Sequence, residues 1–248
     1  LPWQGRLNQP RLTTDLTNTR RSLVEGGAVF VADAYTERYL DVRSNSAYAR
    51  SRYRNGSATL RSALAPYVFG SRYVEHRIDD PANLSSVYES YPRTTEQVIH
   101  NYSRAEEPPA NLSVGATGSD QWAYLGNNTL GEMTTRAALD TELDRDRAAA
   151  AATGWGTDRL TVYQHARTES RYGWAWVMRW DDANETDGLE AALSAFADAR
   201  EGESNAAFRL EPVGDETVAL VFGDTGFVDQ AEVTGTDGNV TVGVSAQS

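Results

Sequence analysis

The stretch RRSLVEGGAVFVADAYTERY, residues 20–39, decides the fold of the first half of this chain. Its apolar residues recur at helical spacing, and the pattern runs from Leu16 to about Leu40. We therefore expect one long helix. The residues that could cap its start are Thr13, Thr14 and Asp15.

Glu25 is the carboxylate at the apolar centre of this helix, in the sequence Leu23-Val24-Glu25-Gly26-Gly27-Ala28. Burying a carboxylate is costly unless a cation, a hydrogen-bond network or a metal ion satisfies it. The two glycines that follow each cost a helix roughly 1 kcal/mol relative to alanine. We infer that another backbone or a site approaches the helix closely there, and the role of Glu25 becomes the central functional question.

The charge of this 248-residue chain is unusual, because all 23 basic residues are arginine and 35 acidic residues give a net charge of −12. Concentrated salt screens the repulsion between carboxylates, and an acidic surface keeps a protein soluble there. The composition is typical of an extreme halophile. It argues against nucleic acid as a partner, because no basic cluster is evident that would neutralise phosphates.

Several features bear on export. Cysteine is absent, which excludes disulfides and cysteine-ligated metals. No apolar run has the length of a membrane span, and no signal peptide is visible, but the chain starts at Leu1 rather than Met, so we expect that a leader or a larger N-terminal part was removed. Asn-x-Ser/Thr sequons exceed the roughly three expected by chance and predict a glycosylated protein outside the cell or on its surface. The candidate asparagines are Asn55, Asn83, Asn101, Asn111, Asn127, Asn184 and Asn239.

The pattern along the chain predicts an α+β fold in three parts. Residues 1–153 are expected to be mainly helical, and residues 224–248 to form a loose tail or one hairpin. Between them, residues 154–223 indicate a β-β-α-β-β unit, an antiparallel sheet with one helix on a face. Its strands are predicted at 160–164, 172–180, 208–212 and 217–222, and its helix at 187–200.

Within the helical part, three predictions are specific. Residues 41–57 could continue the first helix, a helix over 59–74 should be interrupted at Pro66, and residues 129–153 should form one or two helices with a break near Asp144. Residues 101–118 are expected to be an exposed loop.

Common catalytic signatures are missing from the sequence. It contains no HExxH, P-loop, Gly-x-Ser-x-Gly or Gly-x-Gly-x-x-Gly pattern. The histidines His76, His100 and His165 are scattered, so a zinc site built from histidines of this chain alone is not expected.

An ordered set of segments nevertheless resembles one family. It comprises LVEGGA at 23–28, TTEQVIH at 94–100, LGE at 130–132, and GWGTDR at 154–159 followed by Trp180-Asp181. The set is similar to exported zinc-metallopeptidase-like proteins of the gluzincin type from bacteria and haloarchaea. Their pattern is HExxH, LVEGDA, STEQ with a following histidine, LGE, GWGGDR and a WD turn. The resemblance covers residues 20–200 and implies a helical part like the C-terminal subdomain of a gluzincin.

The resemblance also implies roles for single residues. Glu25 matches the third zinc ligand, which completes a site with two histidines of an HExxH helix. His100 and Glu96 match the TEQ motif, where the histidine is a catalytic candidate that stabilises an oxyanion, supports a ligand or fixes a loop. Positions interpreted as structural are Glu132, Trp155, Asp158 and Arg159, with the Asp158–Arg159 turn expected to fasten the sheet unit to the helical part.

Departures from the pattern leave the activity open. HExxH is absent, Gly27 replaces an acidic residue and Asn101 replaces a proline. Either the chain is a fragment that lacks its zinc helix, or it descends from peptidases and has lost the metal site. Alone it should be inactive, and zinc would need ligands from outside this chain.

The alternative is a non-enzymatic cell-surface, assembly or binding protein on the same scaffold, or more remotely a solute- or glycan-binding module that uses exposed Trp and Tyr. The partners we expect are its own N-terminal segment or another copy.

Overall fold

The computed structural model describes residues 12–245 and has an α+β fold. It divides into two compact units. The first unit comprises Leu1–Pro108 and Gly131–Ala137, and the second comprises Pro109–Leu130 and Ala138–Ser248. Among the described residues, no helix is long and apolar enough to cross a membrane.

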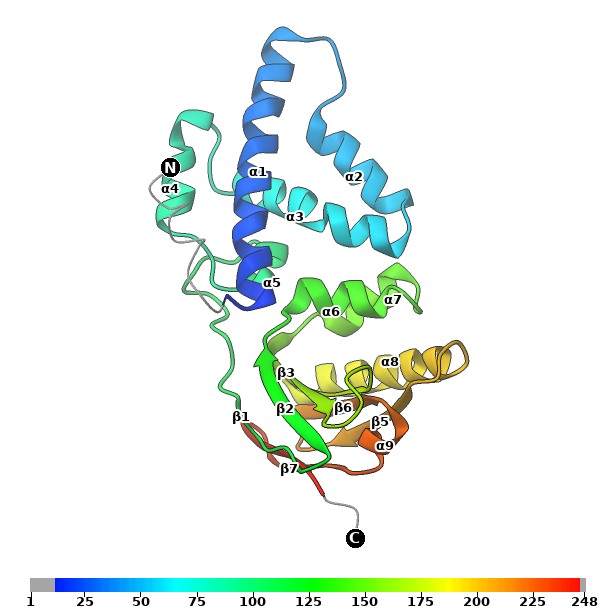
Figure 1. Cartoon of the computed structure of the whole chain (residues 1–248). Helices are drawn as coiled ribbons and strands as arrows, with labels where there is room; N and C mark the ends of the chain where they lie inside the picture. The colour runs from blue at the N-terminus through cyan, green and yellow to red at the C-terminus, as the bar shows by residue number, and fades with distance from the viewer. Residues whose placement is uncertain (1–11, 246–248) are drawn as a thin grey trace. The chain divides into compact units, whose positions relative to one another are not determined.

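The first unit is helical (Figure 1). Hydroxyl side chains accept backbone N–H groups at the starts of four of its helices, which stabilises ends that would otherwise leave donors unpaired. The elements are α1 (Thr14–Tyr39), α2 (Asn45–Asn55), α3 (Ala58–Glu75), the 3-10 turn η2 (Pro81–Asn83), α4 (Leu84–Glu89), α5 (Thr95–His100) and most of α6 (Glu132–Leu139). The capping residues are Thr13, Ser44, Ser57 and Thr94.

The predicted long helix is α1, and the close approach expected at its glycines is present. A Cβ atom on Gly26 would collide with the backbone of Gly70 in α3, and a Cβ atom on Gly27 would collide with the hydroxyl of Tyr88. The core beside this crossing contains Leu23, Phe69, Tyr73, Val74 and Val98.

Two local predictions for the first unit were wrong. Residues 41–57 do not continue the first helix, because Leu40 adopts an extended conformation and Ser44 caps a separate helix, α2. Pro66 does not interrupt α3, which continues through it. Proline removes one helical hydrogen bond at a cost of about 3 kcal/mol, and burial of Pro66 with its neighbours Ala65 and Val68 offsets this cost.

The second unit is built on a five-stranded antiparallel sheet with the order β2-β3-β4-β6-β5. A smaller sheet has the order β1-β8-β7, in which β1 and β8 are parallel. The strands are β1 (Ser113–Ala116), β2 (Trp122–Asn128), β3 (Trp155–His165), β4 (Tyr172–Trp180), β5 (Ala207–Pro212), β6 (Thr217–Gly223), β7 (Ala231–Thr236) and β8 (Asn239–Val244). The helices are α7 (Arg145–Ala152), α8 (Ala183–Glu201) and α9 (Thr225–Val228).

Both faces of the larger sheet are buried. On β4, Val177 belongs to a core shared with Val240 and Val242 of β8, whereas Trp176 belongs to a core shared with Leu189 and Leu193 of α8. Alternation along a strand directs successive side chains to opposite faces. The tryptophan-rich strand is therefore largely core, with Trp176 and Trp180 buried.

The β-β-α-β-β prediction corresponds to β3, β4, α8, β5 and β6, and the predicted break near Asp144 is present, since Asp144 caps α7. The hairpin that was one expectation for residues 224–248 is formed by β7 and β8, but the segment is not loose where it is described, because α9, β7 and β8 belong to the core. The predicted loop 101–118 contains β1. The predicted boundary at 153/154 falls inside the second unit, because β2 pairs with β3 across it.

Candidate functional site

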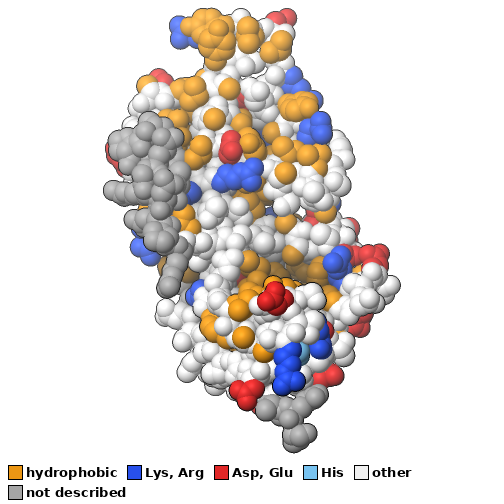
Figure 2. Space-filling view, viewed as in Figure 1, with side chains coloured by type: hydrophobic (Ala, Val, Ile, Leu, Met, Phe, Trp, Pro, Cys, Tyr) orange, Lys and Arg blue, Asp and Glu red, His pale blue; other side chains and the backbone are white. Residues whose placement is uncertain are grey.

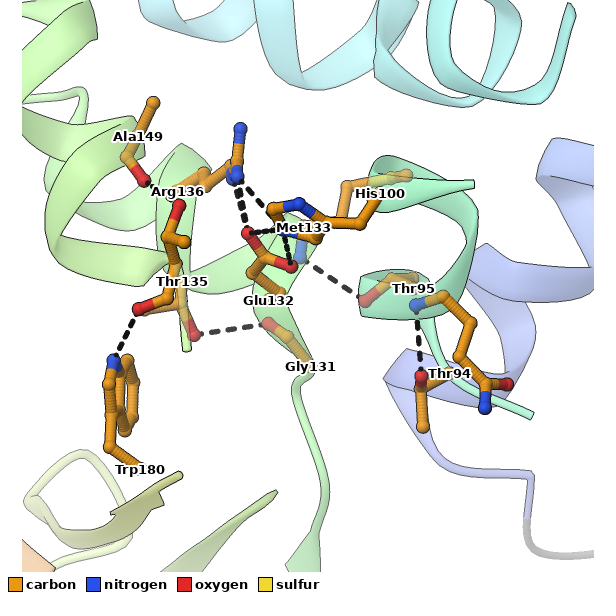
Figure 3. Close-up of polar contacts among 12 residues, drawn as sticks. Thr94, Thr95, His100, Gly131, Glu132, Met133, Thr135, Arg136, Ala149 and Trp180 are labelled. Atoms are coloured by element: carbon orange, nitrogen blue, oxygen red, sulfur yellow. Dashed lines mark hydrogen bonds and ion pairs between the residues drawn. The ribbon is translucent and has the colours of Figure 1, made fainter. Parts of the chain in front are cut away.

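A buried charge cluster in the first unit brings together three side chains from α5 and α6 (Figure 3). Nε2 of His100 lies 3.1 Å from both carboxylate oxygens of Glu132. Glu132 is completely buried, and Nε of Arg136 donates to its Oε1 at 2.7 Å. The guanidinium of Arg136 also forms an ion pair with this carboxylate. The two partners satisfy a carboxylate that would otherwise be costly to bury.

The start of α6 explains why Glu132 lies where it does. Gly131 has φ 82°, and a Cβ atom on it would collide with the carboxylate of Asp15. Only glycine adopts this conformation at little cost. Glu132 then occupies the first turn of α6, where the helix dipole favours a negative charge, and Arg136 follows one turn later.

Asp15 and Thr95 join three segments of the first unit. Asp15 Oδ1 accepts the Thr95 hydroxyl at 2.6 Å and the Thr95 backbone N–H at 2.9 Å. The same hydroxyl oxygen accepts the backbone N–H of Met133 at 3.2 Å. Asp15, considered above as a cap for α1, thus fixes α5 and the start of α6, while Thr13 is the cap.

Gln97 is a residue of the TEQ motif that the sequence did not single out. It is completely buried, and its amide nitrogen donates to the carbonyls of Glu106 at 2.7 Å and Glu107 at 3.1 Å. Its amide oxygen accepts the backbone N–H of Arg93 at 2.7 Å. Gln97 therefore holds the segments on either side of α5. The position of Gln97 between the cap residue Thr94 and His100 was the feature of the sequence that could have indicated this role.

His100 is oriented but not enclosed. Its side chain keeps 23% of its surface exposed, and its ring stacks on Tyr102 with centroids 5.5 Å apart. Its hydrogen bonds all involve Nε2 in the described part of the chain, and Nδ1 takes no part in the contacts with Glu132 and Arg136. A carboxylate that fixes one ring nitrogen leaves the other in a defined direction.

Asn101 ends α5 in the left-handed region with φ 59°. Proline, the residue of the family pattern, is locked near φ −65° and cannot adopt this conformation. Asn101 is also the exception among the sequon asparagines, because it is partly buried and its side-chain oxygen has no partner among the described residues. The exposed sequon asparagines are Asn55, Asn83, Asn111, Asn127, Asn184 and Asn239.

Glu25 lies on α1 with 29% of its side chain exposed, and it forms a loose ion pair with Arg21 at 3.9 Å, one turn earlier. Glu96, in contrast, is buried in α5. Among residues 12–245 no group of three histidine, aspartate or glutamate side chains is close enough to hold a metal ion. The described residues thus do not form a zinc site by themselves.

Asp158 lies inside β3 in the second unit rather than in a turn. It is completely buried and accepts the indole N–H of Trp155 at 3.1 Å and that of Trp176 at 3.0 Å. The backbone N–H of Leu130 donates to the same carboxylate at 2.9 Å, and Arg159 donates to the hydroxyl of Thr129 at 3.0 Å. The two residues fasten the segment that ends at Leu130, just before Gly131.

Arginines shift the ionisation of Tyr91, which lies shortly before α5. Burial raises its pKa, but hydrogen bonds and charge from Arg104 and Arg20 outweigh burial, and the net effect is a lowered pKa. Arg104 also lies over the ring, 5.0 Å from its centroid.

Comparison with known proteins gives one family. No curated protein and no solved structure matches the chain. The model of a family described as a domain of unknown function, DUF8575, matches residues 122–248, which is 127 of the 248 residues. The chain belongs to the DUF8575 family.

Proposed function

We propose that the chain is an exported relative of gluzincin-type zinc metallopeptidases in which His100 and Glu25 are the remaining site residues. The observation that carries the proposal is the fixed imidazole of His100, held through Nε2 by the buried Glu132 while Nδ1 takes no part in this contact. When Nε2–H donates to Glu132, Nδ1 of the neutral imidazole accepts a hydrogen bond or a proton from a ligand, and the imidazolium so formed can return that proton to a ligand oxygen.

Glu25 supports the proposal through its exposure. Its ion pair with Arg21, at 3.9 Å, is at the limit of such a contact, so the carboxylate can exchange this contact for a stronger one. Because the described residues form no group of three ligands, zinc would need further ligands from outside residues 12–245. We derive no reaction step through zinc.

The proposal also places the protein outside the cell in concentrated salt. Its support is the lysine-free, acidic composition and the exposure of six sequon asparagines. An acidic surface remains soluble where salt screens its charges.

The test is to measure zinc binding by the full encoded protein, using equilibrium dialysis and metal analysis. Glu25→Gln should weaken zinc binding at least about 100-fold, by analogy with the 10–100-fold cost of losing a residue that merely supports a ligand. The matched control is Glu37→Gln, an exposed carboxylate on the same helix, which should bind as the parent does. Absence of zinc from the parent, or equal binding by both variants, would refute the zinc assignment.

His100 is tested separately. If the full protein cleaves peptides, His100→Ala should lower kcat by roughly 100-fold while zinc content is unchanged, as expected for a group that stabilises developing charge. An unchanged kcat with a lowered Tm would show that His100 only supports the fold.

The second candidate is a non-enzymatic assembly or binding protein. It is favoured by a concentration of exposed apolar side chains on α1, α2 and the loop between them. It predicts that Glu25→Gln and His100→Ala leave partner binding intact, which separates it from the first candidate.

A further inference from the structure

Exposed apolar side chains gather on the second half of α1, on α2 and in the loop between them (Figure 2). Large hydrophobic side chains with high exposure number seven in the described chain, and six of them lie here. The seventh, Leu125, lies on β2. The six are Val31, Tyr35, Tyr39, Leu40, Val42 and Tyr48, and they are between 42% and 65% exposed. We call these six residues, together with the arginines beside them, the Arg–Tyr surface.

Charge distinguishes the same region. Residues 31–55 contain five arginines and three acidic residues, a net charge of +2, although the whole chain has a net charge of −12. Arg52 lies over the ring of Tyr48 and donates to its hydroxyl at 3.0 Å, and Arg38 lies over Tyr39 with its guanidinium carbon 5.3 Å from the ring centroid. The arginines thus stand beside the exposed rings.

Tyrosine and arginine are the residues that protein interfaces favour. Tyrosine buries a large area with little loss of conformational freedom, and arginine forms paired hydrogen bonds with carboxylates. A surface of exposed tyrosines bordered by arginines therefore fits an acidic protein surface.

The chain itself contains such a surface. The second unit has 22 acidic residues and 8 arginines, a net charge of −14, whereas the first unit has 15 arginines and 13 acidic residues, a net charge of +2. Carboxylates are dense in and around α8, where residues 181–203 contain eight acidic residues and one arginine. Burial, and then the charge of Asp187, raises the pKa of Glu190.

We infer that the Arg–Tyr surface of one copy docks on the acidic α8 region of a second copy. The two surfaces differ, so the contact is head to tail and can repeat into rings or filaments. In 1 M salt the Debye length is about 3 Å, so repulsion between two acidic chains is screened while groups in contact still interact. Nucleic acid binding, in contrast, weakens steeply with salt.

The test is sedimentation velocity of the whole chain over a range of concentrations in high salt. The parent should associate with concentration. One variant, Tyr35→Ser/Arg43→Glu/Tyr48→Ser, removes the Arg–Tyr surface, and another, Asp187→Arg/Asp198→Arg, removes the acidic surface. Each should lower the association constant at least about tenfold, with an unchanged circular dichroism spectrum.

Mixing the two variants gives the sharpest result. Each retains one of the two surfaces, so an equimolar mixture should form dimers and stop there. The matched control, Leu125→Ser/Asp120→Arg, changes an exposed hydrophobic residue and an exposed acid elsewhere and should associate as the parent does.

Three outcomes would overturn the inference. They are a parent that stays monomeric at all concentrations, variants that associate as the parent does, and a mixture that stays monomeric. If the parent is monomeric but binds duplex DNA or anionic phosphatidylglycerol vesicles, and the Arg–Tyr variant does not, the surface serves a polyanion or a membrane instead.

Discussion

Gly26 of α1 lies against the backbone of Gly70 in α3, and neither position has room for a methyl group, because one on Gly26 would collide with Gly70 and one on Gly70 with the backbone of Ser22. Alanine normally stabilises a helix interior by about 1 kcal/mol relative to glycine. Here Gly26→Ala and Gly70→Ala should each destabilise the first unit by about 3 kcal/mol, because backbone atoms cannot move aside as a side chain can. Urea unfolding followed by far-UV circular dichroism measures the change.

The control for that prediction is Gly188→Ala in α8. A Cβ atom on Gly188 meets no other atom within 4 Å, so the helix-propensity gain of about 1 kcal/mol should be realised. If Gly26→Ala also stabilised the protein, the two helices would not be in backbone contact.

Asparagine should not be able to replace Asp158. Its carboxylate accepts N–H groups from Trp155, Trp176 and Leu130, and Asp158→Asn would turn a donor toward these donors. We expect a loss of about 3 kcal/mol, typical of a charged hydrogen-bond acceptor lost from the interior. Tryptophan fluorescence during urea unfolding reports on the second unit, which contains every described tryptophan. The exposed Asp187→Asn should leave the midpoint unchanged.

Removing one charge of the Glu132–Arg136 pair should cost more stability than removing both charges. Glu132→Gln leaves a buried guanidinium without its carboxylate and should cost about 3 kcal/mol. The double variant Glu132→Met/Arg136→Met removes both charges and should cost less. Urea unfolding of the parent, Glu132→Met, Arg136→Met and the double variant completes the thermodynamic cycle. A double variant as unstable as the sum of the single variants would show that the pair is not coupled.

Asp224 should make the stability of the second unit depend on pH. A hydrogen bond from Arg171, above all, lowers the pKa of Asp224. A lowered pKa in the folded state contributes stability that is present above the unfolded pKa near 3.9 and is lost as the pH falls through the folded pKa. Asp224→Asn should therefore cost up to about 1 kcal/mol at pH 7, and its Tm should converge on that of the parent below about pH 4. Asp229→Asn, an exposed neighbour, should show no such convergence.

Sequon occupancy should follow exposure. In a host that glycosylates Asn-x-Ser/Thr sites, the six exposed asparagines are accessible after folding, whereas the side-chain oxygen of Asn101 is buried. Peptide mass spectrometry should find Asn101 unmodified. Glycan on Asn101 with retained helical content would show that modification precedes folding of α5.

Much of the fold was readable from local pattern. The glycines in the first helix predicted a close approach, and Gly26 provides it, because an unfavourable residue at a helix centre needs a packing reason. Asp144 marked the start of α7 through its capping chemistry. Strand β1 was missed, because Ser113–Ala116 is short and gains its pairing from β8, more than one hundred residues later.

The site was only half readable. TTEQVIH pointed to α5 and to His100, but nothing near His100 in the sequence indicates that Glu132 would hold its ring. The role of Gly131 likewise depends on Asp15, which lies over one hundred residues earlier. Such pairings arise from tertiary packing, which local periodicity does not encode.

The passage of the chain through residues 131–137 has a consequence for biosynthesis. The first unit takes Glu132 and Arg136 from a segment that follows twenty-two residues of the second unit. A nascent chain that has emerged only as far as Pro108 therefore carries His100 without its carboxylate and Thr95 without Met133. The first unit is therefore complete only after residues 131–137 have been synthesised, and no single cleavage can release either unit with all its residues.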